Sequence, residues 1–264
     1  MIFVVAAAVL ALGAVAQADG RTGRVGAAKP RFAYRYLYSS RLVARTAVSY
    51  GWNLIDVSSK DEVDVLPPGA KGLVWVGDWN NTSCSWEVSD AKLTKKVMSM
   101  VGDPKVVGFY FSDEPNPVAC PDAPRRHVQR SALIRRLDPS VFTVMVARSN
   151  TDTSASELRL WRGAATYVGL DPYACDVGKA CNFARITRMI RAADKAHIAY
   201  WGVLQAFADY DWRWPTPAEL TRIASIWKAS NAKGSMTFAW KWSDSRLALH
   251  PKLLAELRRF NRST

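Results

Sequence analysis

The sequence predicts a single-domain (β/α)8 TIM barrel of the α/β class, and two observations point to it. Short runs of β-branched and aromatic residues recur along the chain, and most of them are followed by an amphipathic stretch long enough for a helix. Eight such units in about 230 residues match a (β/α)8 barrel at the small end of its size range. A doubly wound open sheet is the alternative that the same alternation allows.

The expected elements alternate throughout the region 30–262. In chain order, the eight predicted strands are Phe32–Tyr38, Trp52–Val57, Leu73–Val76, Val106–Phe111, Phe142–Val146, Tyr167–Leu170, Ala199–Leu204 and Ser235–Trp240. Helical patterns lie between or after them at Asp90–Met100, Ala123–Leu137, Ala155–Trp161, Phe183–Ala196, Pro217–Ser230 and Leu247–Phe260. In the fourth of these, Ile186, Met189, Ile190 and Ala193 share one face, which is typical of a helix packed on a sheet.

Functional side chains follow most of the predicted strands. In a (β/α)8 barrel, the active site is built from the loops that leave the carboxyl ends of the strands. The corresponding segments here are Asp78–Asn81, Ser112–Pro115, Arg148–Asn150, Asp171–Tyr173, Gln205–Phe207 and Lys241–Asp244. We therefore expect a functional site at this face of the barrel.

Two adjacent carboxylates, Asp113 and Glu114, come directly after the strand-forming run Val106–Phe111 and before a proline. Hydrolysis of a glycosidic bond needs a carboxylic acid with a raised pKa and a second carboxylate that acts as base or nucleophile. We assign Glu114 as the general acid, and Asp171 or Asp113 as the base or nucleophile. The alternative is an acidic turn without catalytic function, because turns favour Asp and Pro on backbone grounds alone.

A glycan site also needs aromatic side chains against which a sugar ring can lie. The chain has 11 tryptophans, several of them at strand ends, although core packing is the alternative role for each one. The candidate substrate-binding residues at these ends are Asp78, Trp79, Arg148, Tyr173, Trp240 and Trp242, and Asp78 and Asp244 are reserve carboxylates.

The first residues and the cysteines suggest export. Residues 1–18 are almost wholly apolar and end in small residues, which predicts a signal peptide and a secreted, extracellular or wall-associated protein. Four cysteines in an exported chain suggest disulfides, and we expect the pairs Cys84–Cys120 and Cys175–Cys181 among the three possible pairings. A zinc site is the alternative, but the chain lacks a Cys-x-x-Cys motif and its three histidines are scattered.

The net charge of +13, from 36 Lys and Arg against 23 Asp and Glu, favours anionic partners such as a wall polymer or a membrane face. Nucleic acid is not expected, because the basic residues form no recognisable reading motif and export would keep the protein from the genome. No stretch after the first is long and apolar enough for membrane insertion. Nothing in the sequence indicates a cofactor or a metal, and we expect a monomer.

Four segments together resemble the strand-end signatures of (β/α)8 glycoside hydrolases of the large clan A kind and their uncharacterised relatives. These are Gly108–Pro115, Gly169–Tyr173, Val203–Phe207 with Pro215–Glu219, and Gly234–Trp240, so that the resemblance covers about residues 106 to 242. In that clan, the acid/base is a glutamate after the fourth strand, often within Asn-Glu-Pro, which corresponds to Glu114. The nucleophile is a second glutamate at the end of the seventh strand, where this chain has Gln205.

The amide at Gln205 cannot attack an anomeric carbon as a carboxylate does, so the resemblance implies a substrate-binding role for it and leaves the nucleophile to Asp171 or Asp113. Three hypotheses follow. The first is a secreted glycosidase that cleaves O-glycosidic bonds of a polysaccharide. The second is a catalytically degenerate carbohydrate-binding barrel, because a fold does not determine a function. The third, hydrolysis of phosphodiesters or binding of a wall polyanion, lacks the histidines and carboxylate-rich metal set that such hydrolysis needs.

Overall fold

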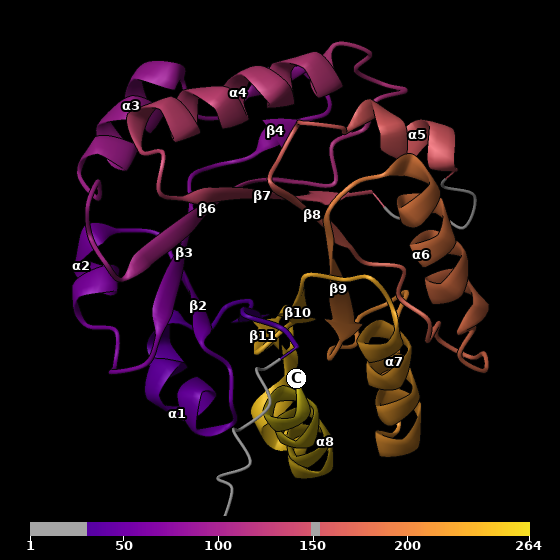
Figure 1. Cartoon of the computed structure of the whole chain (residues 1–264). Coiled ribbons are helices and arrows are strands. Elements are labelled where there is room, and N and C mark those ends of the chain that lie inside the picture. The colour runs from indigo at the N-terminus through magenta and orange to yellow at the C-terminus, as the bar shows by residue number, and fades with distance from the viewer. Residues whose placement is uncertain (1–30, 149–153) are drawn as a thin grey trace, which may run out of the picture.

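The protein is a closed barrel of parallel strands surrounded by helices, as the computed structural model shows for residues 31–148 and 154–264. The predicted signal peptide at residues 1–18 lies outside the described residues. The strands follow the order β1-β10-β9-β8-β7-β6-β3-β2 around the barrel, and β1 pairs with β2 to close it (Figure 1). This topology confirms the predicted (β/α)8 fold and excludes the open sheet.

The barrel strands are β1 Arg35–Leu37, β2 Leu54–Val57, β3 Lys71–Trp75, β6 Val106–Asp113, β7 Phe142–Ala147, β8 Tyr167–Leu170, β9 Tyr200–Gln205 and β10 Gly234–Phe238. The helices are α1 Ala44–Ser49, α2 Lys60–Asp64, α3 Asp90–Met98, α4 Ala123–Leu137, α5 Ala155–Leu160, α6 Ala184–Ala196, α7 Pro217–Ala229 and α8 Pro251–Ser263. Short 3-10 turns η1 Arg41–Val43 and η2 Leu247–Leu249 precede α1 and α8.

Each of the eight predicted strands is present, with ends that differ from the predicted ones by at most three residues. The sequence analysis missed the short helices α1 and α2, whose five or six residues are too few to display a helical period. It also missed two hairpins in the loops, β4 Trp79–Asn80 with β5 Ser85–Trp86, and β11 Lys241–Trp242 with β12 Ser245–Arg246. Both hairpins lie beyond the carboxyl ends of barrel strands.

The helix starts have a local chemical cause. At α7, the Thr216 hydroxyl accepts from the Glu219 backbone N–H, the Glu219 carboxylate accepts from the Thr216 N–H, and Pro217 occupies the first turn. This reciprocal cap satisfies backbone donors that the first turn leaves without helical partners. Ser59, Ser89 and Ser154 accept from backbone N–H groups in the same way at α2, α3 and α5.

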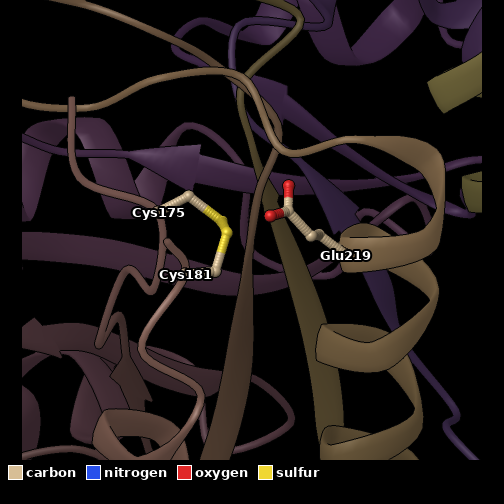
Figure 2. Close-up of side chains that lie close together, drawn as sticks. All are labelled: Cys175, Cys181 and Glu219. Atoms are coloured by element: carbon tan, nitrogen blue, oxygen red, sulfur yellow. A yellow bond between two sulfur atoms is a disulfide. The ribbon is translucent and has the colours of Figure 1, made fainter. Parts of the chain in front are cut away.

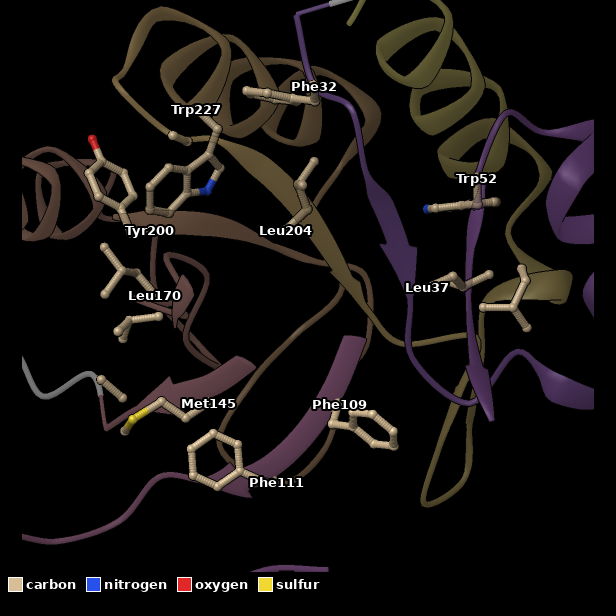
Figure 3. Close-up of a cluster of buried hydrophobic side chains, with 14 of the residues drawn as sticks. Phe32, Leu37, Trp52, Phe109, Phe111, Met145, Leu170, Tyr200, Leu204 and Trp227 are labelled. Atoms are coloured by element: carbon tan, nitrogen blue, oxygen red, sulfur yellow. The ribbon is translucent and has the colours of Figure 1, made fainter. Parts of the chain in front are cut away.

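The buried side chains form two layers, one on each side of the barrel wall. The larger layer lies between strands and helices, and Figure 3 shows members of it, including Trp227 of α7 beside Tyr200 of β9. The smaller layer fills the barrel interior with Tyr36, Leu54, Leu73, Tyr110, Val144, Val146, Trp201, Val203 and Met236. Because the strands are buried on both faces, their sequences are continuous apolar runs and do not alternate between apolar and polar residues.

Gly202 shows how closely α7 approaches the barrel. A Cβ atom at this position would lie 2.3 Å from the indole of Trp227, so only glycine allows the contact. The Trp227 Nε1–H donates to the Val203 carbonyl at 3.2 Å. The packing of Trp227 on Gly202 and its hydrogen bond to Val203 hold α7 against β9. They thereby also position the loop that connects β9 to α7.

Both predicted disulfides are confirmed. Cys84–Cys120 joins the turn between β4 and β5 to the loop after β6, and Cys175–Cys181 closes a small loop after β8. Both therefore stiffen the face that carries the strand ends. Within the described ranges 31–148 and 154–264, every helix is too short or too polar to cross a bilayer.

Candidate functional site

A cavity of about 390 Å³ opens at the carboxyl ends of the barrel strands. Among the described residues, its polar lining consists of four carboxylates, one arginine, four tyrosines and one threonine, namely Asp113, Glu114, Asp171, Asp209, Arg148, Tyr36, Tyr38, Tyr110, Tyr173 and Thr237. Its apolar lining consists of Val146, Val203, Met236, Phe207, Phe238, Trp212 and Trp242. The structure therefore brings the three predicted catalytic residues into one cavity, together with Arg148, Tyr173 and Trp242 of the predicted substrate-binding set.

An irregularity in β6 turns Asp113 into this cavity. Tyr110 pairs with Val144 of β7, but Asp113 pairs with Val146, so three steps along β6 match two along β7. In a regular strand, Tyr110 and Asp113 would point to opposite faces. The extra residue puts both on the inner face, where the Tyr110 hydroxyl donates to Asp113 Oδ1 at 2.9 Å.

Ser112, which the same irregularity turns outward, meets a buried histidine. The Ser112 hydroxyl lies 2.9 Å from Nε2 of His127 on α4, and His127 Nδ1 lies 2.6 Å from the Ala123 carbonyl. Burial lowers the pKa of His127 to about 4, so the ring is neutral at pH 7. The pair anchors the end of β6 from the helix side.

The turn after β6 is held from the neighbouring loop. Glu114 has φ of +46°, in the left-handed region that side-chain-bearing residues rarely adopt. The Asn81 side chain spans this turn, because its Nδ2 donates to the Glu114 carbonyl at 3.1 Å and its Oδ1 accepts from the Asn116 N–H at 2.7 Å. Together with the Cys84–Cys120 disulfide, these contacts hold Glu114 at the cavity wall.

Asp113 is chemically unusual. Burial raises its pKa to about 7, and the neighbouring charges of Glu114 and Asp78 add to the rise, against the hydrogen bond from Tyr110. At neutral pH, this carboxyl group is therefore divided between its protonated and ionised forms. A group in this state can both give and take a proton at the pH of most biological reactions.

The pKa of Tyr173 also reflects the carboxylates of the cavity. Burial raises the pKa of its phenol well above the usual value, and the negative charges of Asp171 and Asp113 raise it further. Glu114 and Asp209 contribute in the same sense. The four carboxylates and Tyr173 all line the same cavity.

One wall of the cavity is aromatic. Phe238 contacts Trp242 with ring centres 4.9 Å apart, and Tyr173 contacts Phe207 at the same distance. Asp209 ties this wall together, because its carboxylate accepts from the Trp212 backbone N–H at 3.0 Å and from the Trp242 indole at 3.3 Å. Flat apolar faces beside carboxylates are what a sugar ring requires.

Gln205 does not line the cavity, contrary to the expectation of a substrate-binding amide. Its oxygen accepts from the backbone N–H groups of Ala174 and Cys175 at 3.1 and 3.0 Å. Its nitrogen donates to the carbonyls of Cys175 and Arg213 at 3.1 and 3.0 Å. The buried amide thus uses all of its donors and acceptors in hydrogen bonds that join the loops after β8 and β9.

Three other predicted binding residues also lie outside the cavity lining. Asp78 is a support for the site, because its carboxylate accepts from the Asp113 N–H at 2.8 Å and the Trp79 N–H at 2.7 Å. Trp79 is a core residue, only 3% exposed and packed edge-on against Trp86. Trp240 borders a smaller neighbouring hollow instead. The reserve carboxylate Asp244 is exposed in the β11–β12 turn.

The sequence analysis missed several lining residues. Tyr36 and Tyr38 were detectable, because they alternate along the first predicted strand and Tyr38 marks its end. Asp209 and Trp212 carried no such signal, since they come from an irregular loop whose path depends on the Cys175–Cys181 loop beside it. Asp176 and Trp212 form an isolated bridge between these two loops.

The Cys175–Cys181 disulfide lies close to Glu219 of α7, as Figure 2 shows. Three such side chains resemble a metal-ligand set, but the two sulfur atoms are bonded to each other. The Glu219 carboxylate accepts from both terminal nitrogens of Arg213, at 2.9 and 2.8 Å. This ion pair lowers the pKa of Glu219 to about 2. The Arg213–Glu219 pair connects the loop after β9 to the start of α7, which accounts for the position of Glu219.

Comparison with protein-family models gives no match, and comparison with curated protein sequences gives none either. Solved structures do match. A GH128 subgroup I endo-β-1,3-glucanase from Amycolatopsis mediterranei in complex with laminaritriose has a TM-score of 0.56 and 12% identity, over 88% of this chain and 100% of that one. A mutant of that enzyme with laminaripentaose has a TM-score of 0.58 and 12% identity, over 85% and 98%.

The chain has the fold of these glycosidases. A β-glucuronidase from Bacteroides uniformis also matches, with a TM-score of 0.54 and 9% identity over 80% of this chain, but over 30% of the longer protein. Identities this low establish the barrel and its resemblance to TIM-barrel glycosidases, and the chemistry has to be argued from this chain's own residues.

Proposed function

We propose that the protein is a glycosidase that cleaves O-glycosidic bonds of a polysaccharide in the cavity at the carboxyl end of the barrel. The observation that carries this proposal is the lining of that cavity, which Asp113, Glu114 and Asp171 share with several aromatic rings. Glycosidic cleavage needs a proton for the leaving oxygen and a carboxylate for water or the anomeric carbon. Both requirements can be met by residues of this lining.

The adjacent pair Asp113 and Glu114 supplies the proton. The charge of Glu114 raises the pKa of Asp113, so the two carboxyl groups do not ionise independently. The pKa of about 7 at Asp113 means that the pair retains a proton near neutral pH. Glu114 transfers a proton to the leaving oxygen, as predicted from the sequence. Asp113 serves as the partner that keeps the pair protonated.

Asp171 is the second catalytic carboxylate in this proposal. It follows β8 directly, is 6% exposed and lines the same cavity. As a base it would take a proton from water, whose oxygen then bonds to the anomeric carbon; as a nucleophile it would form that bond itself. In this proposal, Arg148 and Tyr173 orient the sugar hydroxyls.

The substrate is proposed to be a glycan outside the cell. The two disulfides support an extracellular location, since such bonds persist in oxidising surroundings, and the predicted signal peptide agrees with it. The laminari-oligosaccharides named with the Amycolatopsis enzyme make β-1,3-glucan a sensible first member of any substrate panel.

The test is a screen of the folded protein against plant, fungal and bacterial-wall polysaccharides, including laminarin, with release of reducing ends as the measurement. We expect the wild type to release product from at least one glycan and Glu114→Gln to lose this activity while still binding it. Asp244→Asn, an exposed carboxylate on the same face, is the matched control and should stay active. Unchanged product release by Glu114→Gln would refute the assignment of the acid.

A second candidate function is glycan binding without catalysis. It is favoured by Gln205, because no carboxylate stands at the end of β9, where the glycoside hydrolases that this sequence resembles carry their nucleophile. Retention of the wild type on a glycan that it never cleaves would decide for this alternative.

A further inference from the structure

A second hollow of about 270 Å³ adjoins the proposed active-site cavity. Arg41, Lys241 and Arg246 lie around it, together with Ser39, Leu42 and the indole of Trp240. The chain after β1 passes from Tyr38 in the main cavity to Ser39 in the hollow, and the chain after β10 passes from Phe238 to Trp240. The Trp240 N–H donates to the Tyr38 carbonyl at 3.1 Å, so these two segments are bonded where the hollows meet.

The β11–β12 hairpin separates the two spaces. Lys241 pairs with Arg246 and Trp242 pairs with Ser245 across the hairpin. Because neighbouring residues of a strand point to opposite faces, Trp242 faces one way and Lys241 with Arg246 the other. Trp242 lines the main cavity, and the two cations line the hollow.

The charges in the hollow are all of one sign. Like charges placed directly opposite each other on a hairpin repel, so the Lys241–Arg246 pair costs stability in the free protein. Neither side chain forms an ion pair within the described part of the chain, whereas Arg41 lies 3.6 Å from Glu62. An anion in the hollow would relieve this repulsion and bind to three cationic side chains.

The main cavity has the opposite charge. Four carboxylates line it, and Arg148 is the one basic side chain in the part of the lining that the structure describes. A polymer with an anionic group on every unit would be repelled there, while a wholly neutral glycan would leave the cations of the hollow unused. The two spaces together fit a chain in which an uncharged sugar lies beside an anionic one.

We infer that the hollow of Arg41, Lys241 and Arg246 is a binding site for a carboxylate or an ester sulfate on a glycan whose neighbouring uncharged unit occupies the main cavity. This site rests on the proposed function, since it extends the same substrate along the face of the barrel. Trp240 and Leu42 offer the apolar contact that a sugar ring needs, and the cations hold its charged substituent.

The test is affinity electrophoresis through gels that contain one glycan each. Laminarin is neutral, and polygalacturonate is charged on every unit. Hyaluronan alternates a carboxylate unit with a neutral one, and κ-carrageenan alternates an ester-sulfate unit with a neutral one. We expect stronger retention by hyaluronan or κ-carrageenan than by laminarin or polygalacturonate, and the preferred gel of the first two distinguishes carboxylate from sulfate. Lys241→Gln/Arg246→Gln should weaken that retention at least about tenfold, as the loss of charge-assisted hydrogen bonds implies.

The matched control is Arg135→Gln/Arg136→Gln, which removes the same charge from exposed positions at the end of α4. Helices run back against the strands, so this end of α4 lies at the opposite face of the barrel. The control should keep the preference. Equal weakening in both double variants would overturn the site, and so would a wild type that does not prefer a partly anionic glycan. Stronger retention of the wild type by a gel of inorganic polyphosphate than by any glycan gel, lost in the hairpin variant, would also overturn it.

The hairpin and the catalytic proposal can fail separately. Retention is measured without turnover, so Glu114→Gln should be retained on the preferred glycan as the wild type is. If no glycan is cleaved but the hairpin variant alone loses retention, the hollow stands and the hydrolase proposal falls. A thermal unfolding curve of the hairpin variant that matches the wild type excludes misfolding as the cause.

Discussion

The ends of β6 and β9 both carry a polar residue on the inner side of the barrel, and the two residues do different things. Asp113 reaches the cavity, where the Tyr110 hydroxyl contacts its carboxylate. Gln205 lies on the same side of its strand as Val203, yet backbone groups of two loops cover it and use all of its hydrogen bonds. The difference teaches that position at a strand end identifies candidates, while the hydrogen-bond partners decide between chemistry and support.

The proposed role of Asp113 in proton transfer is tested most strongly by Asp113→Asn. An amide keeps the shape but cannot hold or transfer the proton, so we expect product release to fall by about 10²- to 10⁴-fold. Because the pKa of Asp113 is about 7, wild-type activity that needs its protonated form declines as the pH rises through about 7. Initial rates from pH 5 to 9 measure this. A variant that keeps the wild-type profile would show that Asp113 is not part of the proton-donating pair.

The supporting half is tested by Gln205→Ala. The substitution leaves the backbone N–H groups of Ala174 and Cys175 and the Arg213 carbonyl without this partner, so the free energy of unfolding should fall by about 3 kcal/mol. Urea denaturation measures the change, and Gln129→Ala on the exposed side of α4 is the matched control. Gln205→Glu should also be destabilised, because a carboxylate cannot donate to the carbonyls of Cys175 and Arg213. A stable and more active Gln205→Glu protein would place this side chain in the cavity after all.

The burial of Asp113 should also make the free energy of unfolding depend on pH. Its folded pKa of about 7 lies above the ordinary value of 3.8, so the folded state binds the proton more tightly than the unfolded state does. The resulting stabilisation is complete below about pH 4 and is lost as the pH rises through about 7. Asp113→Asn should therefore gain stability relative to the wild type between these limits. Denaturation curves at pH 4.5 and 8 measure it, and Asp244→Asn should lack the trend.

The smallest expected effect belongs to the hairpin beside the cavity. Lys241→Gln removes the repulsion with Arg246, which should raise the free energy of unfolding by about 0.2–0.5 kcal/mol at low salt. In about 1 M salt the gain should disappear, because exposed charges are screened. Arg246→Lys keeps the repulsion and serves as the control. A loss of stability in Lys241→Gln would mean that the lysine has a stabilising partner in the free protein.

Much of the site could be located in the sequence because it depends on strand ends. In a parallel barrel, all carboxyl ends meet at one face, so Asp113, Glu114, Arg148, Asp171 and Tyr173 could be grouped before any distance was known. The failures have a common cause. Trp79 and Gln205 also stand at strand ends, but whether such a side chain is covered depends on loops from distant parts of the chain.

The sequence by itself determined the barrel, its strands and the acidic turn after the fourth of them, because alternating strand and helix patterns and strong turn residues act over a few neighbouring positions. Tertiary structure alone decided which of these acids has an unusual pKa. The extra residue in β6, opposite a regular β7, turned Asp113 inward beside Tyr110 and into surroundings that raise its pKa to about 7. Pairing register, burial and neighbouring charge are properties of segments far apart in the chain, and they exist only once the barrel has closed.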